Sequence, residues 1–244
     1  VDAVLGYVGS GDCLAVAPVA EEMKKFLILY DCGTPRIFEE RDYNYVFRTA
    51  AHAAMDNVSL GLYLKAKNIK VESINYINQD YAWGHDSLKD FQLTAEQLFP
   101  QAKTRQDLRP KFGAGQYGTE ISSLLSSPAT VTHSSLWGGD LQSFILQAAP
   151  RGVMRRSQLI LSAGDHVLPG LGNKMPDGVI LGARGAYGLM SPDTPLNRWW
   201  FKLYEDREKV IPVQAPYRMA QGLMGLKLAV EKAMAANGGK KPNH

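Results

Sequence analysis

Short apolar stretches alternate with longer, helix-patterned stretches along most of the chain. Residues 4–8 and 26–30 are continuous apolar runs of strand length, whereas residues 14–25 and 86–99 carry apolar side chains at helical spacing. Strands that alternate with helices in this way are typical of parallel sheets covered by helices. The pattern therefore predicts an α/β fold.

The same alternation continues to the end of the chain and indicates two lobes. Further strands are expected at residues 45–49, 71–77, 104–108, 131–136, 159–162 and 179–186, and further helices at 50–67, 118–126, 194–208 and 214–236, with one more ending at 149. Small residues gather near 49–50 and 184–191, where a chain could cross between lobes. We expect residues 1–49 and 184–244 to form a discontinuous first lobe and residues 50–183 the second.

Composition narrows the function classes. The chain has 244 residues, 45% hydrophobic and 21% charged, and a net charge of +3, as in ordinary globular proteins. The one basic cluster, Arg151, Arg155 and Arg156, is too short to indicate nucleic-acid binding, and no apolar run has the length of a membrane span. Because the chain starts without Met on a core strand, we expect that earlier elements have been lost.

Two cysteines follow neighbouring predicted strands. Cys13 and Cys32 either form a disulfide, as an oxidising compartment would allow, or remain two partly buried thiols. The sequence leaves both interpretations open.

Polar and aromatic residues gather after the predicted strands, where open α/β sheets bind ligands. Ser10 and Thr34 offer hydroxyl groups beside helix N-termini, which suits a carboxylate, and Asp165 offers an anion, which suits an ammonium group. Four aromatic residues supply apolar walls: Trp83, Trp137, Tyr187 and Tyr217. Together these groups indicate a site for an α-amino acid or a small carboxylic acid.

Each of these residues also has a structural interpretation. Ser10 and Asp165 are suitable helix caps, and Thr34 before Pro35 is common in turns. Trp83 and Trp137 lie beside glycines, in segments expected to be loops, which favours a binding role. The adjacent pair Trp199–Trp200 lies on a helical face and is expected to pack in the core.

The sequence contains no recognisable metal or catalytic motif. No histidine stands at ligand spacing from another histidine or a cysteine, and neither a nucleophile elbow nor a Walker loop is present. We therefore expect no metal, no cofactor and no enzyme activity.

A nucleotide-binding interpretation is the alternative. Gly6, Gly9 and Gly11 join a strand to a helix, and Asp31 ends the next strand about 20 residues later, as in dinucleotide-binding folds. The glycine spacing, however, is G-x-x-G-x-G rather than G-x-G-x-x-G. This alternative is an NAD(P)-dependent enzyme similar to short-chain dehydrogenases.

Four separated segments carry a resemblance to a known family. These are VLGYVGSGDCLAVAPVAEE (residues 4–22), YVFRT (45–49), NQDYAWG (78–84) and SLWGGD (135–140). They resemble, in the same order, segments of the branched-chain amino-acid type of periplasmic binding protein. The resemblance covers nearly the whole chain. It implies a type I periplasmic binding-protein fold, in which two α/β lobes joined by three crossings enclose a solute for an ABC importer.

The resemblance also implies roles for individual residues. Ser10 and Thr34 are expected to hold the ligand carboxylate from the first lobe. Trp83 and Trp137 stand where the family has aromatic residues on the second lobe, and Asp165 stands near the position of the family's acidic partner for the ammonium group. Tyr217 stands near a further pocket aromatic. The family's opening strand and helix and its last crossing are expected to be missing here.

The sequence therefore predicts a non-enzymatic solute receptor. The expected ligand-binding residues are Ser10, Cys32, Thr34, Trp83, Trp137, Asp165, Tyr187 and Tyr217. The expected ligand is an amino acid, or otherwise an acid without an ammonium group, held by closure of the lobes about the crossings near residues 49–50 and 184–188. The expected partner is an ABC transporter membrane permease, and the expected location is the periplasm, or the cell exterior with a lipid anchor.

Overall fold

The first of two parallel sheets contains the beginning of the chain. A computed structural model describes residues 2–185 and 190–241. Strands β1 (Ala3–Gly6), β2 (Phe26–Leu29) and β3 (Val46–Arg48) pair in parallel in the order β1-β2-β3. Alternate side chains of β2 point to opposite faces of the sheet.

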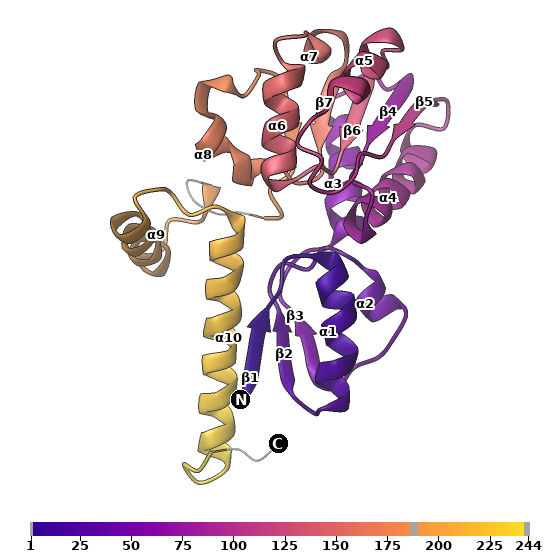
Figure 1. The fold of residues 1–244 in the computed structure, drawn as a ribbon. Coiled ribbons are helices and arrows are strands. Elements are labelled where there is room, and N and C mark those ends of the chain that lie inside the picture. Colours follow the sequence, from indigo (N-terminus) through magenta and orange to yellow (C-terminus); the bar gives the residue numbers. More distant parts are fainter. Residues whose placement is uncertain (1, 186–189, 242–244) are drawn as a thin grey trace.

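Helices cover both faces of this first sheet (Figure 1). On one face α1 (Ser10–Glu22) and α2 (Arg36–Glu39) bury Leu27 and Leu29. On the other face α10 (Gln214–Ala236) runs beside β1, and a Cβ on its Gly222 would lie 3.5 Å from Ile28. That distance is an ordinary van der Waals contact, so α10 packs directly on the sheet at this position.

The second sheet has five parallel strands in the order β5-β4-β6-β7-β8. Their bounds are Ser73–Ile77 (β4), Lys103–Leu108 (β5), Val131–Ser134 (β6), Gln158–Leu161 (β7) and Ile180–Leu181 (β8). Helices α3 (Ala53–Ala66) and α4 (Ala82–Leu98) bury apolar side chains against one face. On the opposite face lie α5 (Gly118–Ser126), α6 (Gly138–Ala148) and α7 (Val153–Arg156), with Phe144 and Ile145 completely buried.

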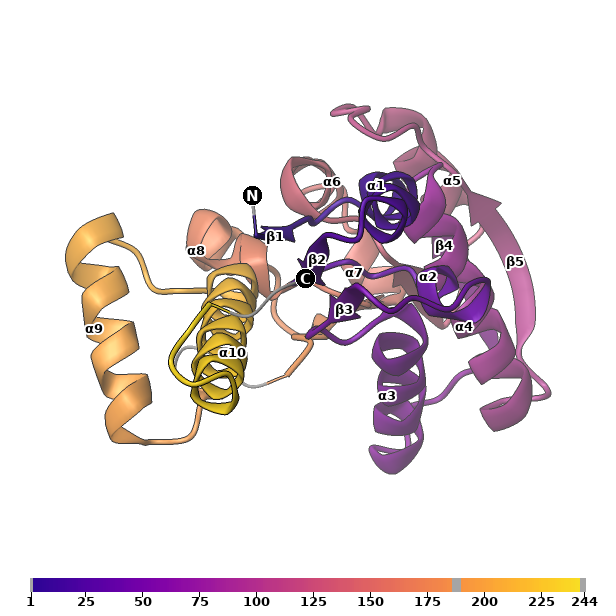
Figure 2. The same ribbon diagram turned by 90° about the horizontal axis from the view of Figure 1, so that it is seen from below.

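Three short helices follow β7: η1 (Asp165–Val167), α8 (Leu168–Leu171) and η2 (Gly172–Lys174). After β8 come two long helices, α9 (Pro195–Glu208) and α10. Thr194 caps α9, because its side chain accepts a hydrogen bond from the backbone N–H of Asn197 at 3.1 Å. Figures 1 and 2 both place α9 outside α10, away from the first sheet.

The α/β architecture with parallel sheets is confirmed, and several local predictions are corrected. Helix α4 starts at Ala82, so Trp83 lies in its first turn and not in a loop. Of the strand expected at 179–186, the described residues 179–185 form only the two residues of β8. The core position expected for Trp199 is wrong, because α9 has no buried residue and Trp199 is 54% exposed.

The two cysteines form a disulfide. Cys13 in α1 and Cys32 after β2 are joined with a Cα–Cα distance of 6.3 Å, and both are completely buried. The disulfide is one of the two alternatives that the sequence left open. It fastens the first helix to the end of the second strand.

The chain moves from the first sheet to the second between β3 and α3, and returns after β8 to α10. Among the helices that the structure describes, none combines the length and the apolar character needed to cross a lipid bilayer.

Candidate functional site

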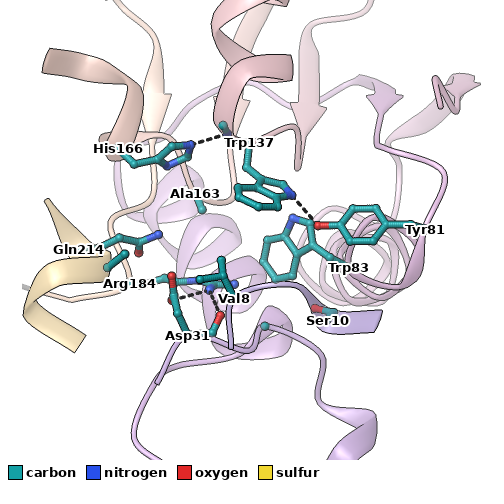
Figure 3. A pocket seen from close by; sticks show the side chains of 13 residues that line it. Val8, Ser10, Asp31, Tyr81, Trp83, Trp137, Ala163, His166, Arg184 and Gln214 are labelled. Carbon is teal, nitrogen blue, oxygen red and sulfur yellow. Dashed lines mark hydrogen bonds and ion pairs between the residues drawn. The ribbon is translucent and has the colours of Figure 1, made fainter. Parts of the chain in front are cut away.

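A cavity of about 240 Å³ lies where the carboxyl ends of strands from both sheets meet (Figure 3). Its lining comes from the loop after β1, α1, the segment after β2, α4, α6, the segment after β7, the return crossing and the start of α10. The residues are Val8, Ser10, Asp31, Gly33, Tyr81, Trp83, Trp137, Gly138, Ala163, His166, Arg184, Gln214 and Ala215. The loops that follow parallel strands all lie at the same edge of their sheet, which explains why segments far apart in the sequence meet here.

Aromatic side chains of the second sheet's helices form one wall of the cavity. The indole N–H of Trp83 donates to the backbone carbonyl of Ser135 at 2.9 Å, and that of Trp137 donates to the Tyr81 hydroxyl. Phe112 packs on both Tyr81 and Trp137, with ring centroids 4.9 Å and 5.9 Å away. Because both indole N–H groups are already used, the two indoles offer mainly apolar ring surface to a ligand.

A buried arginine lies between the two sheets in this cavity. The Arg184 Nε donates to Asp56 Oδ2 at 2.9 Å, and its Nη1 donates to Asp31 Oδ1 at 3.0 Å. Asp31 follows β2 of the first sheet, whereas Asp56 belongs to α3 beside the second sheet. The guanidinium carbon also stands 4.4 Å from the ring centroid of Trp83. Arg184 thus connects both sheets and the aromatic wall.

Burial and ion pairing act in opposite directions on these charges. Burial raises the pKa of Asp56 to about 6, although Arg184 opposes the increase, and burial likewise raises the pKa of Asp31. Burial alone would lower the pKa of Arg184, but the two aspartates outweigh it and raise that pKa above its ordinary value. At neutral pH the guanidinium is therefore charged.

Two further polar side chains line the cavity beside α6 and α10. His166 Nε2 accepts a hydrogen bond from the backbone N–H of Gly138 at 2.8 Å, which leaves the proton of the neutral ring on Nδ1. Burial, with a smaller contribution from Arg184, lowers the pKa of His166 to about 4, so the ring is neutral at pH 7. His166 Nδ1 and Gln214 Oε1 are buried and have no hydrogen-bond partner among the described residues.

Three of the sequence-predicted site residues meet at this cavity. Ser10, Trp83 and Trp137 all line it (Figure 3). Ser10 lies in the first turn of α1, with 1% of its surface exposed. Trp137 stands at the N-terminal end of α6.

The other predicted residues do not line this cavity. Cys32 belongs to the disulfide, and Thr34 is completely buried, where its hydroxyl oxygen accepts from the backbone N–H of Arg36 at 3.3 Å, as in a turn. Asp165 begins the short helix η1 with 1% of its surface exposed, one residue before the lining residue His166.

Tyr217 lies at a second, smaller cavity of about 200 Å³ between α9 and α10. Its hydroxyl donates to Asn197 Oδ1 at 2.7 Å, and its ring packs edge-on against Trp200 at 6.2 Å. Tyr187 lies outside the residues that the structure describes.

Sequence reasoning missed several residues that line the cavity. Tyr81 lies inside the NQDYAWG segment and was within reach of the same argument as Trp83. Asp31 was considered only as the acidic residue of a nucleotide site. Arg184 falls inside the strand expected at 179–186, and Gln214 starts a helix that no predicted strand directly precedes, so neither stands at a predicted strand end. Within residues 2–185 and 190–241, no group of three or more His, Cys, Asp or Glu is arranged to hold a metal ion.

Comparisons with known proteins agree with this architecture. A family model described as periplasmic binding protein matches residues 1–243. A search of curated proteins found no match. Many solved structures are similar, at identities too low to show more than the fold.

Three of the similar structures illustrate the range of ligands. One is a solute-binding protein of an ABC transporter from R. palustris in complex with 4-hydroxybenzoate, at 22% identity and a TM-score of 0.81, covering 98% of this chain and 63% of that one. Another is an amino-acid ABC transporter substrate-binding protein from Pseudomonas fluorescens Pf-5, at 20% identity and a TM-score of 0.79, covering 96% and 61%. The third is a leucine-binding protein from Thermotoga maritima, at 16% identity and a TM-score of 0.76, covering 96% and 65%.

The chain spans less than two thirds of the length of each of these proteins. Its two parallel α/β sheets have the type I periplasmic binding-protein fold. Nothing in these comparisons supports the dehydrogenase alternative. With a family model that matches residues 1–243, the chain belongs to the periplasmic binding protein family.

Proposed function

We propose that this protein is the extracytoplasmic receptor of an ABC importer and binds an amino acid or a related small carboxylate in the cavity between the two sheets. The observation that carries the proposal is the cavity itself, which is lined from both sheets and has a wall of aromatic rings. Its volume of about 240 Å³ is below the range of about 300–1,000 Å³ that is usual for drug-sized ligands. A solute of small size is therefore the best match.

The proposed mechanism is closure of two lobes, residues 1–49 with 184–244 and residues 50–183, around the solute. Ser10 and Asp31 contribute from the first lobe, and Trp83 and Trp137 from the second. A ligand that touches both lobes favours the closed state by as much as it binds that state better than the open one. The closed receptor would then deliver its solute to the membrane permease, without catalysis of its own.

The proposed location is the periplasm, or the cell exterior with a lipid anchor. The disulfide between Cys13 and Cys32 supports an oxidising compartment.

The proposed ligand class rests on chemistry and on the similar structures. One of the structures named above is a complex with 4-hydroxybenzoate, and the other two proteins are named for an amino acid and for leucine. All of these molecules carry a carboxylate. Here Ser10 offers a hydroxyl at the N-terminus of a 13-residue helix, where backbone N–H groups favour an anion. The aromatic wall would hold the apolar part of either kind of acid.

The test is a thermal-unfolding and calorimetry screen of the twenty common L-amino acids and a set of benzoates, with NAD and NADP included. At a concentration 100 times its dissociation constant, a true ligand adds about 2.7 kcal/mol of stability. Trp137→Ala should abolish that gain, whereas Trp199→Ala, on the exposed helix α9, should keep it. A screen in which no acid binds, or only the dinucleotides do, would overturn the proposal. Native mass spectrometry of a co-purified solute gives an independent answer.

A further inference from the structure

One terminal nitrogen of the Arg184 guanidinium, Nη2, takes no part in the ion pairs that hold this side chain. Nε is used by Asp56 and Nη1 by the carboxylate and the backbone carbonyl of Asp31. Nη2 makes no hydrogen bond to any described residue. It lies beside Gly33, another residue of the cavity lining, since a Cβ added to Gly33 would stand 2.5 Å from it. Two N–H donors of a charged group are therefore available next to the cavity.

The guanidinium is held in a fixed plane by its surroundings. One edge is bonded to two carboxylates, and one face stacks on the Trp83 indole, which is itself fixed through its hydrogen bond to Ser135. The side chain is only 5% exposed. A rigid and desolvated guanidinium forms stronger and more selective hydrogen bonds with a carboxylate than an exposed, mobile one does.

We propose that Arg184 binds the carboxylate of the solute through Nη2, which makes it a specificity-determining residue of the cavity. This inference rests on the function proposed above and names the group on the chain that recognises the acid. Ser10, whose hydroxyl makes no hydrogen bond to the rest of the described chain, is a second donor in the same cavity. The solute class is a small molecule with a free carboxylate, whether aliphatic or aromatic.

The neighbouring aspartates orient the Arg184 guanidinium but do not use all of its N–H donors. Their oxygens occupy Nε and Nη1, and the positive charge of Arg218 also acts on Asp31 and Asp56. The two cations thus balance the two carboxylates before a ligand binds. A solute carboxylate at Nη2 adds a charged hydrogen bond that no protein group in the described chain makes.

The test compares an acid with its amide in matched variants. From the screen above, the tightest-binding acid and its carboxamide (for example benzoate and benzamide, or L-leucine and L-leucinamide) are titrated by calorimetry at pH 7. In the unmodified protein the acid should bind far more tightly than the amide. Arg184→Lys retains the positive charge but lacks Nη2, and it should weaken binding of the acid by about 10- to 100-fold while changing that of the amide little.

Two further variants make the result specific. Arg184→Gln combined with Asp56→Asn removes one cation and one anion together, and it should show the same loss of preference for the acid with a retained melting transition. Arg36→Lys alters an arginine that pairs with Asp86 at 3.2 Å but does not line the cavity, and it should keep the preference.

The outcomes separate this inference from the proposed function. If an acid binds the unmodified protein and both folded Arg184 variants still prefer it over its amide to the same extent, the inference is wrong although the receptor function stands. If no acid in the screen binds at all, both fail.

Discussion

Loss of the Cys13–Cys32 disulfide should cost a large part of the stability of the first sheet. The two residues are 19 positions apart, and closing a loop of about 20 residues removes enough entropy from the unfolded chain to stabilise the folded one by about 3 kcal/mol. Both residues are completely buried, so solvent does not reach the linkage in the folded state. The double variant Cys13→Ala with Cys32→Ala should therefore be about 3 kcal/mol less stable.

Urea unfolding followed by far-ultraviolet circular dichroism measures this difference. With a slope of about 2–3 kcal/mol per molar urea, a loss of about 3 kcal/mol moves the midpoint down by roughly 1–1.5 M. Unfolding exposes the linkage to solvent, so dithiothreitol present during the titration should lower the midpoint of the unmodified protein toward that of the double variant, and should leave the double variant unchanged. An oxidised protein and a double variant that unfold at the same urea concentration would refute the loop-closure reasoning.

Three other predictions concern buried groups elsewhere in the chain. Burial lowers the pKa of His133 to about 3, so the unfolded chain binds the proton preferentially and stability falls as the pH decreases below about 6.5. Between pH 7 and pH 5 this loss of unfolding free energy is about 2 kcal/mol. Urea titrations at the two pH values should show that His133→Gln loses less unfolding free energy than the unmodified protein, by that amount. Gly33→Ala places a Cβ in collision with the Trp83 ring, so calorimetry should show no ligand binding. Gly11→Ala, whose Cβ would have no atom within 4 Å, should bind normally. Asp140→Ala leaves the buried amide of Gln79 and two backbone N–H groups without their acceptor, and should lower the unfolding free energy by about 1–3 kcal/mol; an unchanged urea midpoint would contradict this.

The sequence was sufficient to predict the fold class and most long elements. Apolar runs and helical periodicity are local properties, so α5 and α10 have the bounds expected at 118–126 and 214–236. Elements of three or four residues, such as α2 and η1, are too short for a periodic signal. Strand β8 ends early because the pairing with β7 is limited to two residues, which composition cannot reveal.

The site was predictable only where a residue directly follows a strand or starts the next helix. Ser10, Trp83 and Trp137 satisfy that rule and line the cavity. Arg184 escaped it because its role depends on Asp31, which lies 153 positions earlier in the chain. Such long-range ion pairs leave no trace in local periodicity.

The distribution of the four tryptophans has a practical consequence. Two indoles border the cavity, whereas Trp199 and Trp200 belong to α9 on the outside of the molecule. Replacing Trp199 and Trp200 by phenylalanine would leave a tryptophan fluorescence spectrum that originates only from Trp83 and Trp137 in the aromatic wall. Solute uptake could then be followed optically in real time, without an attached dye.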